Sequence, residues 1–439
     1  MCISLAGRRS VSMKSFRIPY GTSYLGLELD EQCINEVHMS KAEEYKAACS
    51  QEELVRGALA KPVYSKHLCD LAANARTLLV ITSDHTRPVP SRITLPIILE
   101  EIRRRNPSII VKILIATGCH RPTTYDEMLK KFGRNLVEKE EIINHDCRDT
   151  DNMVYKGLLP SGGELWLNSL VDWADVVISE GFIEPHFFAG FSGGRKSILP
   201  GIASEKTVLA NHCSKFIASS YARTGNIRNN PINEDMVYAA IAAKLQFILN
   251  VVIDGEKNII NAFAGDPLKA HEAGCDFVKK LSSVKSDKAA DIVITSNGGY
   301  PLDQNIYQAV KGMTAAEACV KKGGVIIMAA ACNDGHGGEE FYKWFANAKS
   351  PSEVAGRIAG IKQQDTIADQ WEAQILARIL CKCEVIIVSD RCDRELITNM
   401  HMKQADSLEQ ALSLAKEKVG AKAKVSIIPD GVSVIVENS

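Results

Sequence analysis

The segment 184–201, with the sequence EPHFFAGFSGGRKSILPG, combines residue types that could do chemistry at close spacing. It contains His186, a serine and two glycines at 192–194, and the adjacent cations Arg195 and Lys196. Paired glycines let backbone N–H groups approach an anion closely, and the cations add positive charge. The spacing fits neither a G-x-x-x-x-G-K-[ST] phosphate loop nor a G-x-G-x-x-G dinucleotide fingerprint. We interpret this segment as the core of an active site.

Two further clusters follow apolar runs that we predict to be strands. Asp84 and Arg87 come after TLLVIT (77–82), and His120 comes soon after IIVKILIATG (109–118). Because histidine titrates near neutral pH, His120 is placed for acid–base chemistry at a strand end. The same residues could instead form a capped turn with a surface ion pair and a hydrogen-bonded loop histidine, and the sequence leaves both interpretations open.

Other candidate residues lie on predicted helices. The spacing of Tyr307, Gln308 and Lys311 places all three on one helix face, where they could together hold a carboxylate. His212 lies on a helix that we expect to begin near residue 204, and by itself it is most simply a satisfied, partly buried histidine. Trp371 fits a core position as well as a site position.

The elements that must position these residues alternate between apolar runs and amphipathic segments. Short β-branched runs between helices predict parallel strands buried on both faces, and therefore a doubly wound α/β fold. The predicted strands are 77–82, 109–118, 174–181, 290–299, 323–331 and 383–390. The predicted helices are 91–105, 123–132, 266–281, 315–322, 339–348, 365–380 and 407–419. Ligands of such sheets bind beyond the carboxyl ends of the strands, where the polar clusters stand.

The length of 439 residues favours two domains rather than one. We place the boundary near residue 285, which gives an N-terminal α/β domain at 1–285 and a C-terminal one at 286–439. The tail 421–439 is expected to form two short strands around Pro429-Asp430-Gly431 and could pack on either domain. Residues 1–12 are not a signal peptide and are interpreted as a disordered leader or an over-called start.

The composition excludes several classes of partner. A formal net charge of −1 leaves no electrostatic footprint for nucleic acid or for an anionic membrane surface. No apolar run reaches the roughly 20 residues that a membrane-spanning helix needs. The 13 cysteines are scattered without a disulfide framework, which favours reduced thiols and a cytoplasmic enzyme.

Taken in order, the polar blocks resemble the nickel-pincer lactate racemase family. The matching blocks are DHTRPVP from Asp84, ATGCHRPTT around His120, EPHFFAGFSGGRK from Glu184, the Asn-His pair at 211–212, Y-Q-x-x-K at 307–311 and Trp371. The resemblance implies two Rossmann-like domains with parallel sheets and an active site in the cleft between them. It also implies a cofactor, a pyridinium mononucleotide whose thioamide and thiocarboxylate groups hold nickel.

The resemblance implies a role for each matching residue. Lys196 would attach the cofactor covalently, His212 would be the nickel ligand, and His120 and His186 would be the acid–base pair. Further cofactor contacts are implied at Asp84, Arg87, Ser192, Gly193 and Gly194. Substrate contacts are implied at Arg87, Tyr307, Gln308, Lys311 and Trp371.

The implied reaction is racemisation or epimerisation of a 2-hydroxy acid, lactate or a relative of it, by reversible hydride transfer to the cofactor. The C-terminal domain would close over the substrate, and cofactor-biosynthesis enzymes would be needed for maturation. One alternative is an NAD-dependent 2-hydroxyacid dehydrogenase, which requires a glycine fingerprint that the sequence lacks. A second alternative is a non-catalytic binding protein for a small anion.

Overall fold

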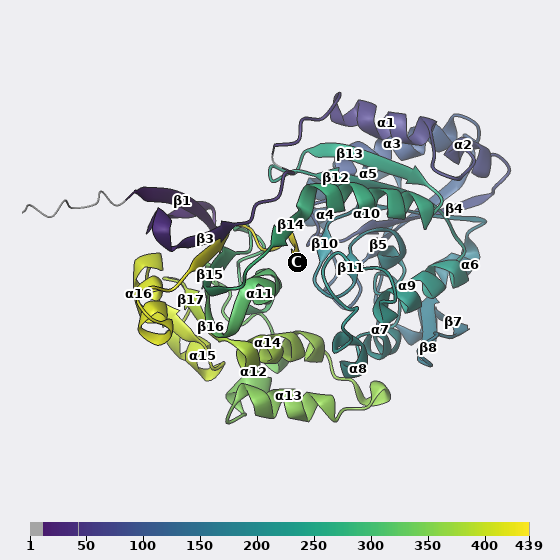
Figure 1. Ribbon diagram of the computed structural model, residues 1–439. Coiled ribbons are helices and arrows are strands. Elements are labelled where there is room, and N and C mark those ends of the chain that lie inside the picture. Colours follow the sequence, from purple (N-terminus) through teal and green to yellow (C-terminus); the bar gives the residue numbers. More distant parts are fainter. Residues whose placement is uncertain (1–11, 43, 439) are drawn as a thin grey trace, which may run out of the picture. The chain divides into compact units, whose positions relative to one another are not determined.

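The computed structural model describes residues 12–42 and 44–438 and divides them into two compact units (Figure 1). The small unit comprises the described residues up to Met39, Ser283–Ile358 and the described residues from Glu372 onward. The large unit comprises the described residues of Ser40–Ser282 together with Ala359–Trp371. The leader predicted at 1–12 lies outside the described residues except for Ser12.

The large unit is built on a six-stranded sheet with the order β13-β12-β9-β4-β5-β6. Five neighbouring strands pair in parallel, and β13 is an antiparallel edge strand. The bounds are β4 Thr77–Ser83, β5 Ile110–Ala116, β6 Glu141–Asn144, β9 Val176–Phe182, β12 Leu245–Ile253 and β13 Ile259–Gly265. Two separate antiparallel hairpins belong to the same unit, formed by β7 Met153–Leu158 with β8 Glu164–Asn168 and by β10 Pro185–His186 with β11 Gly190–Phe191.

Helices surround the sheet of the large unit. They are α1 Gln51–Ala60, α2 Leu68–Leu71, α3 Ser91–Arg103, α4 Tyr125–Phe132, α5 Arg134–Lys139, α6 Leu170–Trp173, α7 Glu205–Asn211, α8 Ser214–Ile217, α9 Pro231–Ala242 and α10 Lys269–Ser282. The apolar side chains of α1 and α3 pack with β4, β5, β9 and β12 in one hydrophobic core. This core fixes the strands whose carboxyl ends carry the polar clusters.

The small unit has its own six-stranded parallel sheet, with the order β18-β17-β16-β15-β19-β3. The bounds are β3 Ile34–Val37, β15 Ala290–Ser296, β16 Val320–Ala329, β17 Glu384–Val388, β18 Lys403–Ala405 and β19 Val425–Ile428. Two strand pairs accompany it, β1 Met13–Tyr20 with β2 Ser23–Asp30 and β14 Ser283–Ser286 with β20 Ile435–Asn438. Its helices are α11 Ile306–Cys319, α12 Glu339–Ala346, α15 Arg394–Asn399 and α16 Leu408–Val419, and α13 Pro351–Ala359 and α14 Gln370–Lys382 lie mostly within it.

The α/β fold with parallel sheets is confirmed, and each predicted strand has a counterpart. The predicted helix 315–322 is wrong, because the helix there is α11, which ends at Cys319. Residues 320–322 are the start of β16, whose Val320 pairs with Ala290 of β15. The units also differ from two consecutive halves of the chain, since β3 pairs with β19 and so brings an N-terminal segment into the sheet of the small unit.

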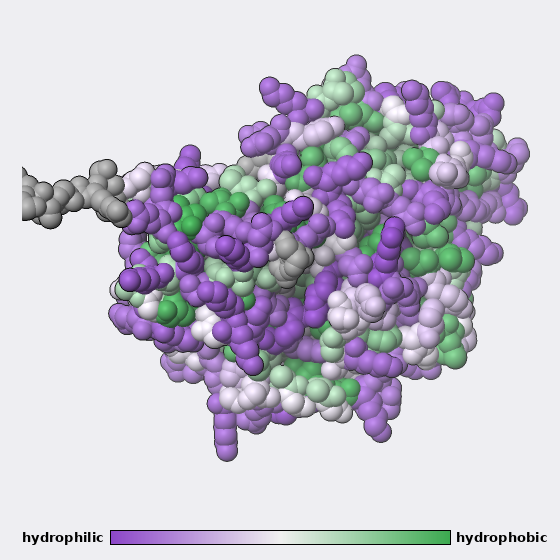
Figure 2. All heavy atoms as spheres, in the orientation of Figure 1, coloured by the Kyte–Doolittle hydropathy of each residue, from purple (hydrophilic) through white to green (hydrophobic). Residues whose placement is uncertain are grey.

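Hydrophilic and hydrophobic residues are intermixed on the face drawn in Figure 2. Across residues 12–42 and 44–438, no helix combines the length and the apolar character needed to span a bilayer.

Candidate active site

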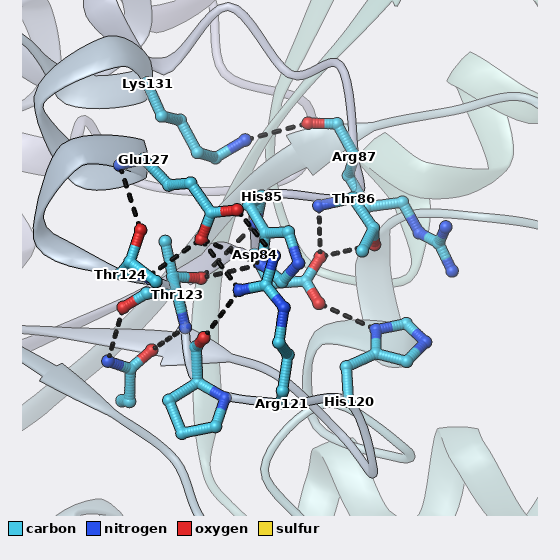
Figure 3. Close-up of polar contacts among 12 residues, drawn as sticks. Asp84, His85, Thr86, Arg87, His120, Arg121, Thr123, Thr124, Glu127 and Lys131 are labelled. Atoms are coloured by element: carbon cyan, nitrogen blue, oxygen red, sulfur yellow. Dashed lines mark hydrogen bonds and ion pairs between the residues drawn. The ribbon is translucent and has the colours of Figure 1, made fainter. Parts of the chain in front are cut away.

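Asp84 and His120 form a hydrogen-bonded pair at the carboxyl ends of two neighbouring strands (Figure 3). Because β4 and β5 pair in parallel, the loops that follow them lie side by side. Nδ1 of His120 donates to Oδ2 of Asp84 at 2.7 Å, and 48% of the His120 side chain is exposed. With its proton on Nδ1, the neutral ring keeps a lone pair on Nε2 and can accept a proton there.

The Asp84 carboxylate is buried and remains ionised. Burial alone would raise the pKa of Asp84, but the hydrogen bond from His120 and the charges of His120 and Arg87 hold it well below its usual range. Oδ1 also accepts hydrogen bonds from the Thr86 N–H at 3.1 Å and from Thr86 Oγ1 at 2.6 Å. The carboxylate can therefore orient His120 and stabilise the imidazolium that forms when the ring takes a proton.

Lys131 of α4 holds the main chain at Arg87 (Figure 3). Its Nζ donates to the Arg87 carbonyl at 2.9 Å. Burial lowers the pKa of Lys131 to about 8, against the opposing charges of Glu180 and Asp84. This bond fixes the turn that places the Arg87 charge near Asp84.

The ring of Phe188, in the loop between β10 and β11, contacts three candidate residues at once. Its centroid lies 4.6 Å from the His186 ring and 5.2 Å from the His212 ring, and Lys196 Nζ lies 5.7 Å from it. The buried side chain of Asn230 donates from Nδ2 to the Phe188 carbonyl at 2.8 Å. His186, His212 and Lys196, for which the sequence suggested three different roles, thus all lie around the ring of Phe188.

His186 adopts the tautomer opposite to that of His120. The Ala189 N–H donates to its Nδ1 at 3.3 Å, and its ring stacks on Phe187 with a centroid distance of 4.9 Å. Because Nδ1 acts as an acceptor, the hydrogen of the neutral ring is assigned to Nε2. The two histidines therefore present the same nitrogen, Nε2, in different states: it has a lone pair in His120 and a hydrogen in His186.

His212 directly follows α7 as its C-terminal cap residue and is 5% exposed. Its Nδ1 donates to the Val208 carbonyl at 3.0 Å, which leaves the lone pair on Nε2. Burial first, and then the charge of Lys196, lowers the pKa of His212 to about 3, so the ring is neutral at physiological pH. A neutral imidazole with one nitrogen fixed by a backbone carbonyl has the geometry of a metal ligand.

The segment Ala359–Trp371, which belongs to the large unit, supports the end of α7. The Trp371 ring packs against the His212 ring with a centroid distance of 5.0 Å. Gln363 donates from Nε2 to the Ala210 carbonyl at 3.1 Å. Trp371 is therefore a neighbour of His212, which is where the sequence resemblance expects a site residue.

The turn at 192–194 is packed tightly against β12. Gly193 and Gly194 have φ angles of 75° and 52°, a region that favours glycine. A Cβ on Gly193 would lie 2.7 Å from Asn250 Oδ1, and the Gly194 N–H donates to the same oxygen at 2.7 Å. Ser192 Oγ donates to the Phe182 carbonyl at 3.0 Å. These groups are used within the protein, and a role of this turn in anion binding stays a prediction.

Arg195 points into the protein rather than toward an anion site. It is 1% exposed and donates from Nε to Asn233 Oδ1 at 2.6 Å, from Nη2 to the Ala189 carbonyl at 2.8 Å and from Nη1 to the Gly193 carbonyl at 3.2 Å. Burial lowers the pKa of Arg195 to about 10, within the range where it stays charged at neutral pH. Its hydrogen-bond partners are neutral acceptors, and they tie the tip of the His186 hairpin to the turn before Lys196.

Two backbone hydrogen bonds connect the His120 loop to the Lys196 turn. The Gly118 N–H donates to the Gly201 carbonyl at 3.0 Å, and the Gly201 N–H donates to the Lys196 carbonyl at 3.2 Å. The pair of Asp84 and His120 is thereby attached to the segment that carries the other candidates of the large unit.

The remaining candidates lie on α11 of the small unit. Lys311 Nζ donates to Gln308 Oε1 at 2.5 Å, so these side chains share one helix face as the spacing predicts. The Tyr307 ring packs against Phe341 with a centroid distance of 5.2 Å. An ammonium and an amide held together in this way can bind a carboxylate.

Comparison with known proteins decides the family. The lactate racemase N-terminal domain model matches residues 20–225, and the lactate racemase C-terminal domain model matches residues 284–436. The chain belongs to the lactate racemase family. The family expected from the polar blocks is therefore confirmed, and neither a dehydrogenase nor a non-catalytic binding protein is supported.

Individual members of the lactate racemase family are similar over nearly the whole chain. The lactate racemase of Thermoanaerobacterium thermosaccharolyticum is 57% identical over 97% of this chain and 99% of its own, and that of Lactiplantibacillus plantarum is 51% identical over 97% and 100%. The structure of the lactate racemase apoprotein from the first organism matches with a TM-score of 0.94 and 56% identity, covering 97% of this chain and 100% of that one. A protein from Thermotoga maritima, 19% identical, matches with a TM-score of 0.66 over 90% of this chain and 100% of its own, which shows the shared fold.

Some residues that build this racemase-family site were missed by motif reasoning. They are the buried polar side chains Asn230, Asn233, Asn250 and His271. Asn250 had a detectable signal, because it is a polar residue within the apolar run of β12. The others stand in polar or mixed segments, where nothing in the spacing separates them from surface residues.

Replacing Asp84 by Asn should lower stability in a pH-dependent way. Since the pKa of Asp84 is lower in the folded chain than in the unfolded one, its contribution is fully present above about pH 5 and is lost as the pH falls through the folded value. We expect the wild type to exceed Asp84→Asn by on the order of 2 kcal/mol at pH 7, and the difference to shrink only below about pH 4, steadily toward the lowest accessible pH. Urea unfolding at pH 7 and at several pH values below about 4 measures this, with the exposed Asp126→Asn as control. A difference that stays constant with pH would contradict it.

Replacing Arg195 by Met should destabilise the chain by about 3 kcal/mol, because several buried acceptors lose their donor. Arg195→Lys should also destabilise it, since an ammonium cannot reach the same acceptors in a fork. Urea midpoints measure both changes, and Arg134→Met, at an exposed ion pair with Glu138, is a control that should shift little. Unchanged urea midpoints for both Arg195 variants would show that the hydrogen bonds of Arg195 do not stabilise the fold.

Proposed function

We propose that this chain interconverts the enantiomers of lactate or of a closely related 2-hydroxy acid. The observation that carries the proposal is the gathering of His186, Lys196 and His212 around the Phe188 ring. Two lactate racemases that match nearly the whole chain support lactate as the substrate.

We propose that the nickel cofactor is the pincer nucleotide, a pyridinium mononucleotide with a thioamide and a thiocarboxylate. The residues present fit this group, because Lys196 offers an amine for covalent attachment and His212 a neutral imidazole nitrogen, a ligand type that suits nickel. Asp84, Arg87 and the turn at 192–194 are proposed as further contacts. When bound, the group supplies the acceptor and donor for the hydride of the substrate's α-carbon.

The chain's own part in this reaction is to move the hydroxyl proton. Racemisation requires one group that takes a proton and another that returns one, on opposite sides of the substrate. His120 is suited to accept at Nε2 because Asp84 holds its Nδ1 proton. His186 takes the complementary role once it is protonated, because an imidazolium can return a proton and is then left as the neutral ring. Exchange of the two roles serves the opposite enantiomer.

We propose that Gln308 and Lys311 bind the substrate carboxylate, with Arg87, Tyr307 and Trp371 as further substrate contacts. The hydrogen bond between Lys311 and Gln308 supports the first assignment. In this assignment, the N-terminal half of the chain binds the cofactor and supplies the two histidines, and the C-terminal half contributes to substrate binding.

Maturation would require the enzymes that build the pincer nucleotide, because the chain itself offers only the anchor and the ligand. We propose that this takes place in the cytoplasm, a location favoured by the scattered cysteines of the sequence.

Incubation of pure L-lactate or pure D-lactate with the loaded enzyme should yield the mirror form until the two are equal, without added nicotinamide cofactor. His120→Ala and His186→Ala should each slow this by roughly 100-fold or more, since each removes one proton-transfer group. Chiral chromatography measures both, across a panel of 2-hydroxy acids. His67→Ala, at an exposed position, is the control. Full activity in either site variant would exclude the two-histidine assignment.

The chain made together with the cofactor-building enzymes should exceed its apo mass by the bound nucleotide. Lys196→Ala should return to the apo mass, because the covalent bond needs the amine. His212→Ala should keep the added mass and lose nickel, since it removes a ligand and not the anchor. Intact-mass spectrometry and metal analysis measure this, with Lys206→Ala, an exposed lysine, as control. Attachment in Lys196→Ala would overturn the anchor role.

A further inference from the structure

Two free thiols meet directly beside His120. Cys119 precedes His120 in the loop after β5 and is exposed, whereas Cys147 follows β6 and is 6% exposed. The side chains of Cys119 and Cys147 interact, and this interaction raises the pKa of Cys119 and lowers that of Cys147. None of the roles assigned above uses either thiol.

The backbone holds the two thiols in this position. β5 and β6 pair in parallel up to Ile115 and Asn144, so the loops after them run side by side. Thr117 Oγ1 donates to the His145 carbonyl at 2.6 Å, and the His145 N–H donates to the Ile115 carbonyl at 3.0 Å. The pairing of β5 with β6 and the hydrogen bonds between the loops that follow them therefore bring the two thiols together.

The surroundings favour one shared proton between the two sulfurs. The hydrogen bond from Cys119 lowers the pKa of Cys147, and the positive charge of Arg148 acts in the same direction. Arg148 itself is held by Glu205 through an ion pair of 2.8 Å. The same interaction and burial raise the pKa of Cys119, so the thiolate forms first on Cys147. Transfer of the Cys119 proton to Cys147 then moves the charge to the exposed sulfur, where an oxidant can reach it.

We propose that Cys119 and Cys147 are a reversible oxidation site that closes to a disulfide and displaces His120 from Asp84. A low-molecular-weight disulfide, RSSR, is the oxidant. The Cys119 thiolate attacks one sulfur of RSSR, forms a mixed disulfide and releases RS⁻, which takes up the proton of Cys147. The Cys147 thiolate then attacks the Cys119 sulfur and releases a second RS⁻, which takes up the other proton. The chain loses two electrons and two protons, and RSSR becomes two RSH.

The consequence for the site comes from the position of Cys119. Because Thr117 is tied to His145, movement of Cys119 toward Cys147 is taken up between Gly118 and His120, and Gly118 has a φ of 55° that marks a turn there. The 2.7 Å bond between His120 Nδ1 and Asp84 cannot survive a large shift of this loop. A displacement of about 1 Å at a reacting group can cost roughly 100-fold in rate.

The cross-link is tested on the full chain without cofactor, so that its outcome does not depend on the proposed function. After incubation with oxidised glutathione, peptide mass spectrometry should find the peptide of Cys119 joined to that of Cys147, and a dithiol reductant should separate them. Cys147→Ser and Cys147→Ala should form no such link, whereas Cys381→Ser, at an exposed cysteine, should form it as the wild type does. Glutathione on Cys119 without a cross-link would overturn the proposal.

The effect on activity rests on the proposed function and is tested on the loaded enzyme. Oxidised glutathione should lower lactate racemisation by more than tenfold, with recovery after dithiol treatment, and Cys147→Ser should keep its activity under the same conditions. A cross-linked enzyme with unchanged activity would overturn the displacement of His120. If the loaded enzyme racemises no 2-hydroxy acid even when reduced, the proposed function fails while the cross-link result stands on its own.

Discussion

A buried guanidinium, that of Arg195, holds the candidate site together, and no carboxylate of the described residues pairs with it. Arg195 donates to the Ala189 and Gly193 carbonyls and to Asn233, so it joins the His186 hairpin, the glycine turn and α9. A buried charge of this kind is tolerated only when hydrogen bonds replace the water it has lost. The result is that the residues on either side of Arg195 in the sequence are held in fixed positions, including Lys196.

The aromatic cluster depends on this constraint. With the hairpin and the turn fixed, Phe188 is placed between the His186 ring, the His212 ring and the Lys196 ammonium. The same packing removes His212 from water, and its neutral ring keeps a lone pair on Nε2. Arg195, which faces inward, thus positions an aromatic ring, and that ring contacts His186, His212 and Lys196.

The sequence allowed the α/β fold, the strand ends and the family to be predicted, because buried parallel strands and polar turns have strong local patterns. Gln308 and Lys311 were predictable for the same reason, since helix spacing alone brings them to one face. The role of Arg195 was not predictable, because adjacent cations in RK give no sign that one is buried. Pairing of β3 with β19 also escaped prediction, since it joins segments almost 400 residues apart and no local pattern encodes such a contact.

His120 and His186 show that residue type and spacing in the sequence do not determine the chemical state of a side chain. Both follow strands and both titrate near neutral pH in isolation, so the sequence makes them equivalent. The structure makes them different, because a carboxylate fixes the proton of His120 on Nδ1 and a backbone N–H occupies Nδ1 of His186. A reaction that accepts a proton on one side and returns one on the other also uses the two rings differently, one as a neutral base and the other as an imidazolium acid. The partners that distinguish the two rings, Asp84 and the Ala189 amide, come from the loop after a neighbouring strand in one case and from the tip of the histidine's own hairpin in the other.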